Sequence, residues 1–248
     1  MDLPTEAEPV RVVEGDCLDV LRGLPDGCVD AVITDPPYGT GGYVARSAGR
    51  HGASGGKKHV RHDWDRWRTD WLDEAVRVSA GAVLSFVPES EMVGLWSELI
   101  GRFDTVRSLV WCKSDPMPTF DGRIGYGTEV ILAAGRLQPV GGRNWFEAST
   151  PRANRDTEHA GHPYQKPLAL MRWLVRLACP PGGVVVDPFG GSGTTAVACA
   201  IEGRRCLLIE QDGSYADIAR RRAADSMGTA PGGLFAGVTG SLFAGATP

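Results

Sequence analysis

The chain has 248 residues, of which 42% are hydrophobic and 23% are charged, a composition that suits one large α/β domain with a sizeable core. The formal net charge of -4 excludes a uniformly basic nucleic-acid coat, although it allows a basic patch on an acidic body. No apolar run approaches the roughly 20 residues of a membrane helix, and residues 1–4 do not begin a signal peptide. The six cysteines are isolated, which favours a reducing cytoplasm over a disulfide scaffold or a metal site.

Short apolar runs alternate with amphipathic stretches, and this alternation predicts a parallel sheet covered by helices. The predicted strands are Val10–Val13, Val29–Thr34, Gly81–Val87, Ser108–Trp111, Glu129–Ala134, Gly183–Val186 and Arg205–Ile209. Apolar residues at helical spacing predict helices over Trp71–Val78, Ser90–Ile100, Lys166–Leu177, Thr194–Ile201 and Ser214–Ala224. We therefore expect residues 1–226 to form a single domain.

Three segments interrupt this alternation. Residues 39–65 have no clear period and are rich in Gly, Ser, His, Lys and Arg, and a loop of such length is usually functional or mobile. Residues 137–161 form a second irregular stretch that mixes arginines with Trp145 and Phe146. Residues 227–248 are rich in Gly and Ala and contain Leu-Phe-Ala-Gly twice. We expect this third segment to be a flexible tail, the alternative being a pair of apolar hooks that dock on the body or on a second subunit.

The first motif that carries chemistry is Asp35-Pro36-Pro37-Tyr38, directly after the predicted strand Val29–Thr34. A proline pair after a strand can be only a rigid exit turn. However, ligands in open α/β sheets bind just beyond the carboxyl ends of strands. There a carboxylate and the carbonyl oxygen of Pro36 can accept the two N–H groups of an aromatic amine, while the Tyr38 ring stacks on the base.

The second motif is the stretch Asp187-Pro188-Phe189-Gly190-Gly191-Ser192-Gly193-Thr194-Thr195, which follows an apolar strand and opens a predicted helix. Its glycines permit a tight turn and the close approach of a ligand to the backbone, but no Gly-Lys-Ser/Thr follows them, which argues against a phosphate-binding loop. Glu210 ends the next predicted strand about twenty residues further on, where a ribose hydroxyl pair is commonly held. The alternative for Glu210 is a solvated charge at a strand end.

Together these motifs resemble the amino-group DNA methyltransferases that use S-adenosylmethionine. The catalytic motif precedes the cofactor motif, which is similar to the circularly permuted β group of that family. Glu14-Gly15-Asp16-Cys17 and His162-Pro163-Tyr164-Gln165-Lys166-Pro167 resemble two further family elements. The resemblance covers roughly residues 10–225. It implies a doubly wound, mostly parallel α/β sheet of seven strands, the Rossmann-like class I methyltransferase fold in permuted form.

The resemblance also implies the role of individual residues. Asp16 and Cys17 would hold the adenine of the cofactor, Glu210 its ribose, and the element before the cofactor strand its methionine end. The catalytic residues would be Asp35, Pro36, Pro37 and Tyr38. The cofactor-binding residues would be Asp16, Cys17, Asp35, Gln165, Lys166, Asp187, Phe189, Gly190, Gly191, Ser192, Gly193, Thr194 and Glu210.

The resemblance makes double-stranded DNA the expected partner, with the target base flipped out of the duplex. The basic insert, residues 39–65, would clamp phosphates, and the short segment 137–161 would recognise the target sequence. The candidate DNA-binding residues are Arg46, Arg50, Lys57, Lys58, Arg61, Arg143, Arg152 and Arg155. The alternative for the insert is an ordinary solvated loop. A homodimer and a cognate restriction enzyme that acts separately are further possible partners.

The expected reaction is methylation of adenine N6, because relatives that act on cytosine N4 more often carry Ser where Asp35 stands. Cytosine-N4 methylation is the first alternative. An RNA or protein methyltransferase and a DNA-binding regulator without turnover are further ones. Methylation of cytosine carbon-5 would need a thiolate in a Pro-Cys pair, whereas here Cys179 precedes Pro180 and is expected to be a small buried residue near a helix end.

Overall fold

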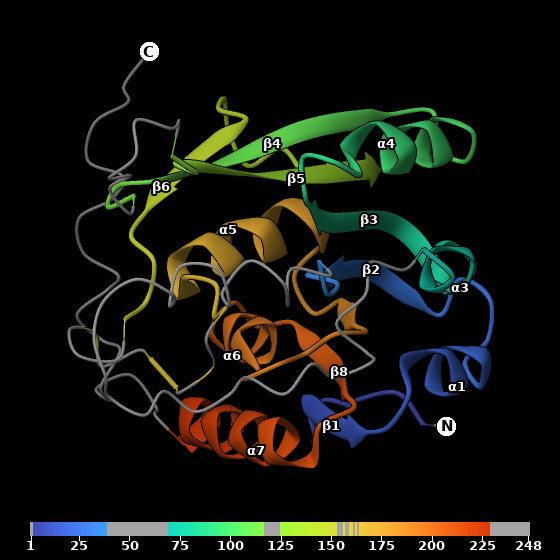
Figure 1. Ribbon diagram of the computed structural model, residues 1–248. Coiled ribbons are helices and arrows are strands. Elements are labelled where there is room, and N and C mark those ends of the chain that lie inside the picture. Colours follow the sequence, from blue (N-terminus) through green and yellow to red (C-terminus); the bar gives the residue numbers. More distant parts are fainter. Residues whose placement is uncertain are drawn as a thin grey trace, which may run out of the picture.

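The computed structural model describes residues 2–38, 69–116, 125–152, 156, 159–160, 162 and 164–228, and all structural statements below concern these residues. Eight strands form one sheet in the order β1-β8-β7-β2-β3-β5-β4-β6 (Figure 1). β5 runs antiparallel to its neighbours β3 and β4, and every other pair in the sheet is parallel. The expected mostly parallel α/β architecture is therefore confirmed.

Every predicted strand and helix is present, with bounds that differ by a few residues. The strands are β1 Val10–Glu14, β2 Val29–Thr34, β3 Ser79–Val87, β4 Val106–Lys113, β5 Thr128–Gly135, β6 Trp145–Ala148, β7 Val184–Asp187 and β8 Arg205–Glu210. The helices are α1 Cys17–Arg22, α3 Trp71–Val78, α4 Met92–Ile100, α5 Leu168–Ala178, α6 Thr194–Ile201 and α7 Gly213–Gly228.

Two elements were not predicted, and one of them changes the strand number from the expected seven to eight. β6 lies inside the segment 137–161, and it adds to the sheet through parallel pairing with β4. Its four residues alternate between exposed and half-buried positions, as expected for an edge strand with one neighbour. The other element, α1, is a short helix that Asp16 caps by accepting the N–H of Leu18 at 2.8 Å.

Helices cover both faces of the sheet. α5, α6 and α7 contribute to a buried cluster on one face, and α1, α3 and α4 contribute to a second cluster on the other face. Because both faces are covered, β7 is buried throughout and β2 nearly so, which explains why these strands are continuous apolar runs. Among the described helices, none is long and apolar enough to cross a membrane.

The strand order brings the predicted motifs together at one edge. β1, β8, β7 and β2 are neighbours in parallel orientation, so their carboxyl ends lie side by side. Glu14 pairs in register with Glu210, and Asp187 pairs with Leu208. The turns that follow these strands therefore surround a single region, which is where ligands of such sheets bind.

Candidate active site

The turn after β7 is organised by Asp187, whose side chain is almost completely buried. Its Oδ1 atom accepts hydrogen bonds from Thr34 Oγ1 at 3.0 Å and from the backbone N–H of Phe189 at 3.1 Å. Its Oδ2 atom accepts from Thr195 Oγ1 at 2.5 Å. Burial raises the pKa of Asp187 to about 7, against the opposing effect of these hydrogen bonds. Asp187 thus joins the end of β2, the turn and the start of α6.

The glycines of this turn are required by close packing. A Cβ atom on Gly190 would lie 2.1 Å from Leu208 Cδ2 on β8. Gly193, which caps α6, has φ of 85°, and a Cβ there would lie 2.7 Å from the Cβ of Ala219 on α7. A side chain at either position would push the turn away from the sheet or from α7, so glycine keeps the turn compact.

Arg222 on α7 fixes the same turn from its other side. Its Nη1 atom donates to the carbonyl oxygen of Ser192 at 2.7 Å and lies 3.2 Å from both Ser192 Oγ and Thr194 Oγ1. No sequence signal singled out this arginine. Ser192 and Thr194 were predicted to bind the cofactor, and their side chains are held by α7 in this structure.

Glu210 and Asp16 stand at the ends of the neighbouring strands β8 and β1. Glu210 Oε2 accepts the backbone N–H of Gly191 at 2.7 Å, and Oε1 accepts that of Asp212 at 2.8 Å. Burial raises the pKa of Glu210, while these backbone donors oppose the rise. The N–H of Gly15 donates to the Glu210 carbonyl oxygen at 3.0 Å and so joins the two strand ends. Each carboxylate oxygen has a second lone pair, so Glu210 can still accept from a ligand hydroxyl.

The Asp35-Pro36-Pro37-Tyr38 motif follows β2, and Asp35 meets the ammonium group of Lys166. The Nζ atom of Lys166 lies 2.7 Å from Asp35 Oδ2. The Oδ1 atom is inaccessible to solvent and accepts no hydrogen bond of normal geometry from the described residues, although the Tyr38 hydroxyl is near enough to lower the Asp35 pKa. Burial raises the pKa of Asp35, and Lys166 opposes that rise. The side chain as a whole is one quarter exposed, so the carboxylate can accept an N–H group of a bound molecule.

Lys166 itself lies among two carboxylates and two rings. Besides Asp35 it contacts Glu129 on β5, with 3.0 Å between Nζ and Oε2. Its Nζ lies 4.7 Å from the centroid of the Phe86 ring and 5.6 Å from that of the Tyr38 ring. Glu129 in turn pairs with Lys113 on β4 at 2.8 Å. Sequence reasoning assigned no function to Glu129 or Lys113, although a charge at the start of an apolar strand was a possible signal.

The element before α5 also packs against the glycine turn. Gln165 is buried, and its Oε1 accepts the N–H of Ala160 at 2.7 Å. The ring centroids of His162 and Tyr215 lie 4.5 Å apart, and a Cβ on Gly191 would lie 3.4 Å from His162 Nε2. Burial, together with the positive charges of Lys166 and Arg222, lowers the pKa of His162 to about 4. This histidine is therefore neutral at physiological pH.

Of the predicted DNA-binding residues, Arg143 and Arg152 are described, whereas Arg46, Arg50, Lys57, Lys58, Arg61 and Arg155 lie outside the described residues. The Arg143 guanidinium lies 4.8 Å from the ring centroid of Trp145 on β6, and both side chains are exposed. Arg152 pairs with Asp115 Oδ2 at 3.1 Å. Arg143 is therefore the better placed of the two for a phosphate or base.

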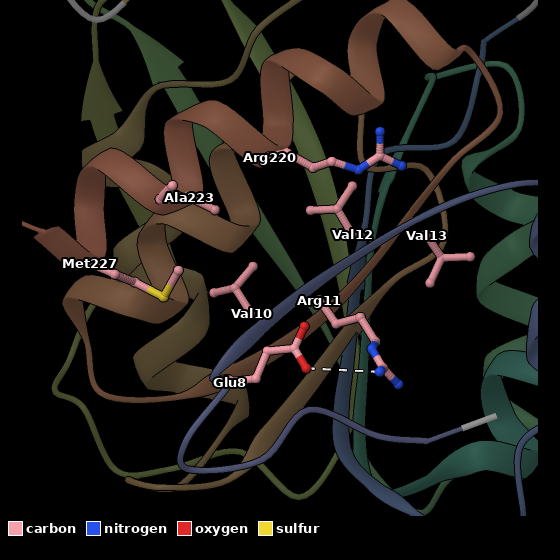
Figure 2. A pocket seen from close by; sticks show the side chains of 9 residues that line it. Glu8, Val10, Arg11, Val12, Val13, Arg220, Ala223 and Met227 are labelled. Atoms are coloured by element: carbon pink, nitrogen blue, oxygen red, sulfur yellow. Dashed lines mark ion pairs between the residues drawn. The ribbon is translucent and has the colours of Figure 1, made fainter.

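Two surface hollows lie apart from the strand-end carboxylates. One, of about 440 Å³, lies between β1 and α7 and is lined by residues that include Val10, Val12, Ala223 and Met227 (Figure 2). The other, of about 460 Å³, lies beside Phe103. Neither contains a residue of the motifs above, so the chemistry of the strand ends, and not the size of a hollow, defines the candidate site.

The residues at the strand ends fit S-adenosylmethionine. That molecule offers ribose hydroxyls, amino groups and a sulfonium charge, and the edge presents acidic side chains and a glycine turn to such groups. The Asp35 carboxylate at the end of β2 is one quarter exposed and can accept from such amino groups. Fold and strand-end chemistry together define a methyltransferase of the class that uses this cofactor.

Comparison with known proteins agrees with this class. A family model described as DNA methylase, of the N6/N4 type, matches residues 29–140 and 138–221, and the chain belongs to this family. The family methylates DNA with S-adenosylmethionine as the methyl donor. The chain is 25% identical to the type II methyltransferase M.HinfI of Haemophilus influenzae, with 85% of this chain and 67% of that protein covered.

Two solved structures share the fold. The M1.HpyAVI complex with S-adenosylmethionine is 23% identical and has a TM-score of 0.64, with 86% of this chain and 98% of that chain covered. The PvuII DNA methyltransferase, which is cytosine-N4-specific, is 16% identical and also has a TM-score of 0.64, with 87% and 86% covered. The expected class I methyltransferase fold is confirmed by these likenesses.

Proposed function

We propose that the protein transfers the methyl group of S-adenosylmethionine to N6 of adenine in a short sequence of duplex DNA. The observation that carries this proposal is the Asp35 carboxylate at the end of β2, which is one quarter exposed and is held by Lys166 at 2.7 Å. Asp in this position supports adenine, because relatives that act on cytosine N4 more often have Ser there. A fold shared with a cytosine-N4 enzyme at 16% identity does not weigh against it.

The chemical difficulty is that the lone pair of the amine is delocalised into the base. Asp35 and the carbonyl oxygen of Pro36 would each accept one N–H of that amine, which favours a pyramidal nitrogen and directs its lone pair. Pro37 would restrict the backbone of this motif, and the Tyr38 ring would stack on the flipped base. Positioning of this kind accounts for large accelerations without a covalent enzyme intermediate.

The bound cofactor supplies an electrophilic methyl group on a sulfonium. As the nitrogen–carbon bond forms and the carbon–sulfur bond breaks, the amine must lose one proton. Asp35 is the base that already accepts a hydrogen bond from that amine in this proposal. Its carboxylate form is therefore the active one, and activity should fall at acid pH as Asp35 becomes protonated.

The contacts proposed for the cofactor follow from which residues lie at the strand ends. Asp16 and the backbone N–H of Cys17 would hold the adenine, Glu210 the ribose, and the backbone from Phe189 to Gly193 the methionine side. Asp187 would act indirectly, because its oxygens already accept from Thr34, Thr195 and Phe189. The ordered turn that Asp187 stabilises is what the cofactor would contact.

DNA contacts are assigned to the basic insert 39–65 and to the segment 137–161, where Arg143 is exposed next to β6. We propose residues 1–226 as a single methyltransferase domain, since all described strands belong to one sheet, although α7 continues to Gly228. A homodimer, a separately acting restriction enzyme and a cytoplasmic location stay predictions.

The test is to incubate unmodified duplex DNA of mixed sequence with S-adenosylmethionine labelled in the methyl group, and then to identify the labelled nucleoside. We expect label in N6-methyldeoxyadenosine, and none with the Asp35→Ala protein. Label in N4-methyldeoxycytidine would replace the adenine assignment. Label only in an RNA or protein substrate, or none at all in a folded protein that binds cofactor, would overturn DNA adenine methylation.

A further inference from the structure

Four side chains of alternating charge form a continuous chain that ends at the catalytic motif. Lys113 pairs with Glu129 at 2.8 Å, Glu129 pairs with Lys166 at 3.0 Å, and Lys166 pairs with Asp35 at 2.7 Å. They come from β4, β5, the segment before α5 and the end of β2. Each side chain is at most one quarter exposed, so solvent screens these pairs only in part.

The position of Lys166 decides what it can do. Its ammonium group contacts two carboxylates and lies near the Phe86 and Tyr38 rings. A carboxylate of the cofactor would have to displace one of these partners to reach the same nitrogen. The arrangement therefore differs from a lysine that offers its charge to the methionine end.

The effect on Asp35 is both geometric and electrostatic. Lys166 pairs with Oδ2, which holds the carboxylate in one orientation at the end of β2, where the exposed part of the side chain can meet a substrate N–H. Burial favours the neutral acid, which cannot take up the proton that the amine must lose, and Lys166 opposes this effect. Glu129 holds Lys166 in place, and the two lysines keep the Glu129 pKa below its ordinary value despite burial.

We propose that Lys166 and Glu129 are positioning residues that fix Asp35 for the target amine, rather than ligands of the cofactor's methionine end. The proposal rests on the proposed function, because it assigns the Asp35 carboxylate the role of amine acceptor. The charged and titratable described groups that act on Asp35 are Lys166, Glu129, Tyr38 and Asp187.

Two substitutions give opposite expectations for the pH at which Asp35 ionises. Lys166→Met removes the charge that lowers the Asp35 pKa, so the acid limb of the pH–rate profile should move to higher pH. Glu129→Gln removes a charge that raises the Asp35 pKa, so the acid limb of the pH–rate profile should not move to higher pH. Turnover should nevertheless fall, because Glu129 no longer holds Lys166 in place. A shift of about one pH unit corresponds to a tenfold loss of activity on the acid side.

The experiment measures turnover against pH and, by calorimetry, the affinity for S-adenosylmethionine in the full chain. We expect affinity within about twofold of wild type for both variants, which is a small difference on the scale of tenfold per 1.4 kcal/mol. Arg176→Gln is the matched control, because it removes a partly buried ion pair with Glu202 from α5 without contacting Asp35. It should leave the acid limb unmoved.

A readout without turnover separates this proposal from the proposed function. The carbon-13 carboxyl resonance of Asp35, titrated in the cofactor-free protein, should show a higher midpoint in Lys166→Met and a lower one in Glu129→Gln. If Lys166→Met does not fold, the isosteric Glu129→Gln carries the test through its lower midpoint. Unmoved midpoints, or a tenfold loss of cofactor affinity in Lys166→Met with an unmoved acid limb, would overturn the proposal. Absence of methyl transfer by the wild-type protein would instead overturn the proposed function.

Discussion

Replacement of Asp187 by Asn is expected to change how the stability of the protein depends on pH. In the folded chain this carboxyl is buried and its pKa is raised to about 7 from an ordinary value of 3.8. Asn has nearly the same shape, and the hydroxyls of Thr34 and Thr195 can donate to its oxygen or accept from its amide. The substitution therefore removes the titration while it keeps the turn.

The direction of this pH dependence of stability follows from proton binding at Asp187. Between the two pKa values the folded protein binds a proton at Asp187 that the unfolded chain has released. The stabilising contribution is thus complete below about pH 4 and is lost as pH rises through 7. At about 1.36 kcal/mol per pH unit, wild type should lose about 2.5 kcal/mol relative to Asp187→Asn between about pH 5 and pH 8.

Urea unfolding followed by tryptophan fluorescence at several pH values measures this difference directly. Other titrating groups are common to both proteins, so they cancel in the comparison. Asp217→Asn, an exposed carboxylate on α7, is the control and should follow the wild-type pH dependence. Parallel profiles for wild type and Asp187→Asn would refute the argument that burial controls this carboxyl.

Three further predictions test the assigned roles. Asp35→Ala should abolish methyl transfer in a protein that still folds and binds cofactor, and near-normal turnover would sink the catalytic assignment. Glu210→Ala should weaken S-adenosylmethionine binding by roughly 1.5–3 kcal/mol in calorimetry. Unchanged affinity would mean that Glu210 only stabilises the glycine turn. Joint neutralisation of Lys57, Lys58 and Arg61 should weaken binding to every duplex and reduce the salt slope by up to about 0.9 per lost phosphate contact. Loss of sequence discrimination at an unchanged slope would contradict phosphate clamping.

The fold was predictable because its strongest signals are local. β2 and β7 are covered on both faces, so they are apolar runs, and each runs into a turn rich in Pro or Gly. β6 was missed because an edge strand of four residues buries little surface and carries a weak pattern. α1 was missed because a helix of six residues shows less than two full turns of periodicity.

The position of the candidate site was predictable where one motif spans only a few residues at a strand end, as at Asp35 and the glycine turn. Glu129, Lys113 and Arg222 depend on which strands and helices become neighbours. A sequence does not state that β5 lies between β3 and β4, and Arg222 is one of three consecutive arginines on α7. Lys166 shows the same limit, because its motif identified the residue while its partners are set by the tertiary structure.

The position of β1 in the sheet has a consequence for the order in which the protein is made. Among the described strands β1 pairs only with β8, so that Val10 meets Cys206. Ribosomes that add about 5–20 residues per second would need on the order of ten to forty seconds to synthesise the intervening chain. Until then β1 lacks its neighbour, and the strand ends at Glu14 and Glu210 cannot come together. The Asp35-Pro36-Pro37-Tyr38 motif is therefore complete in the nascent chain long before the strand ends proposed to hold the methyl donor are assembled.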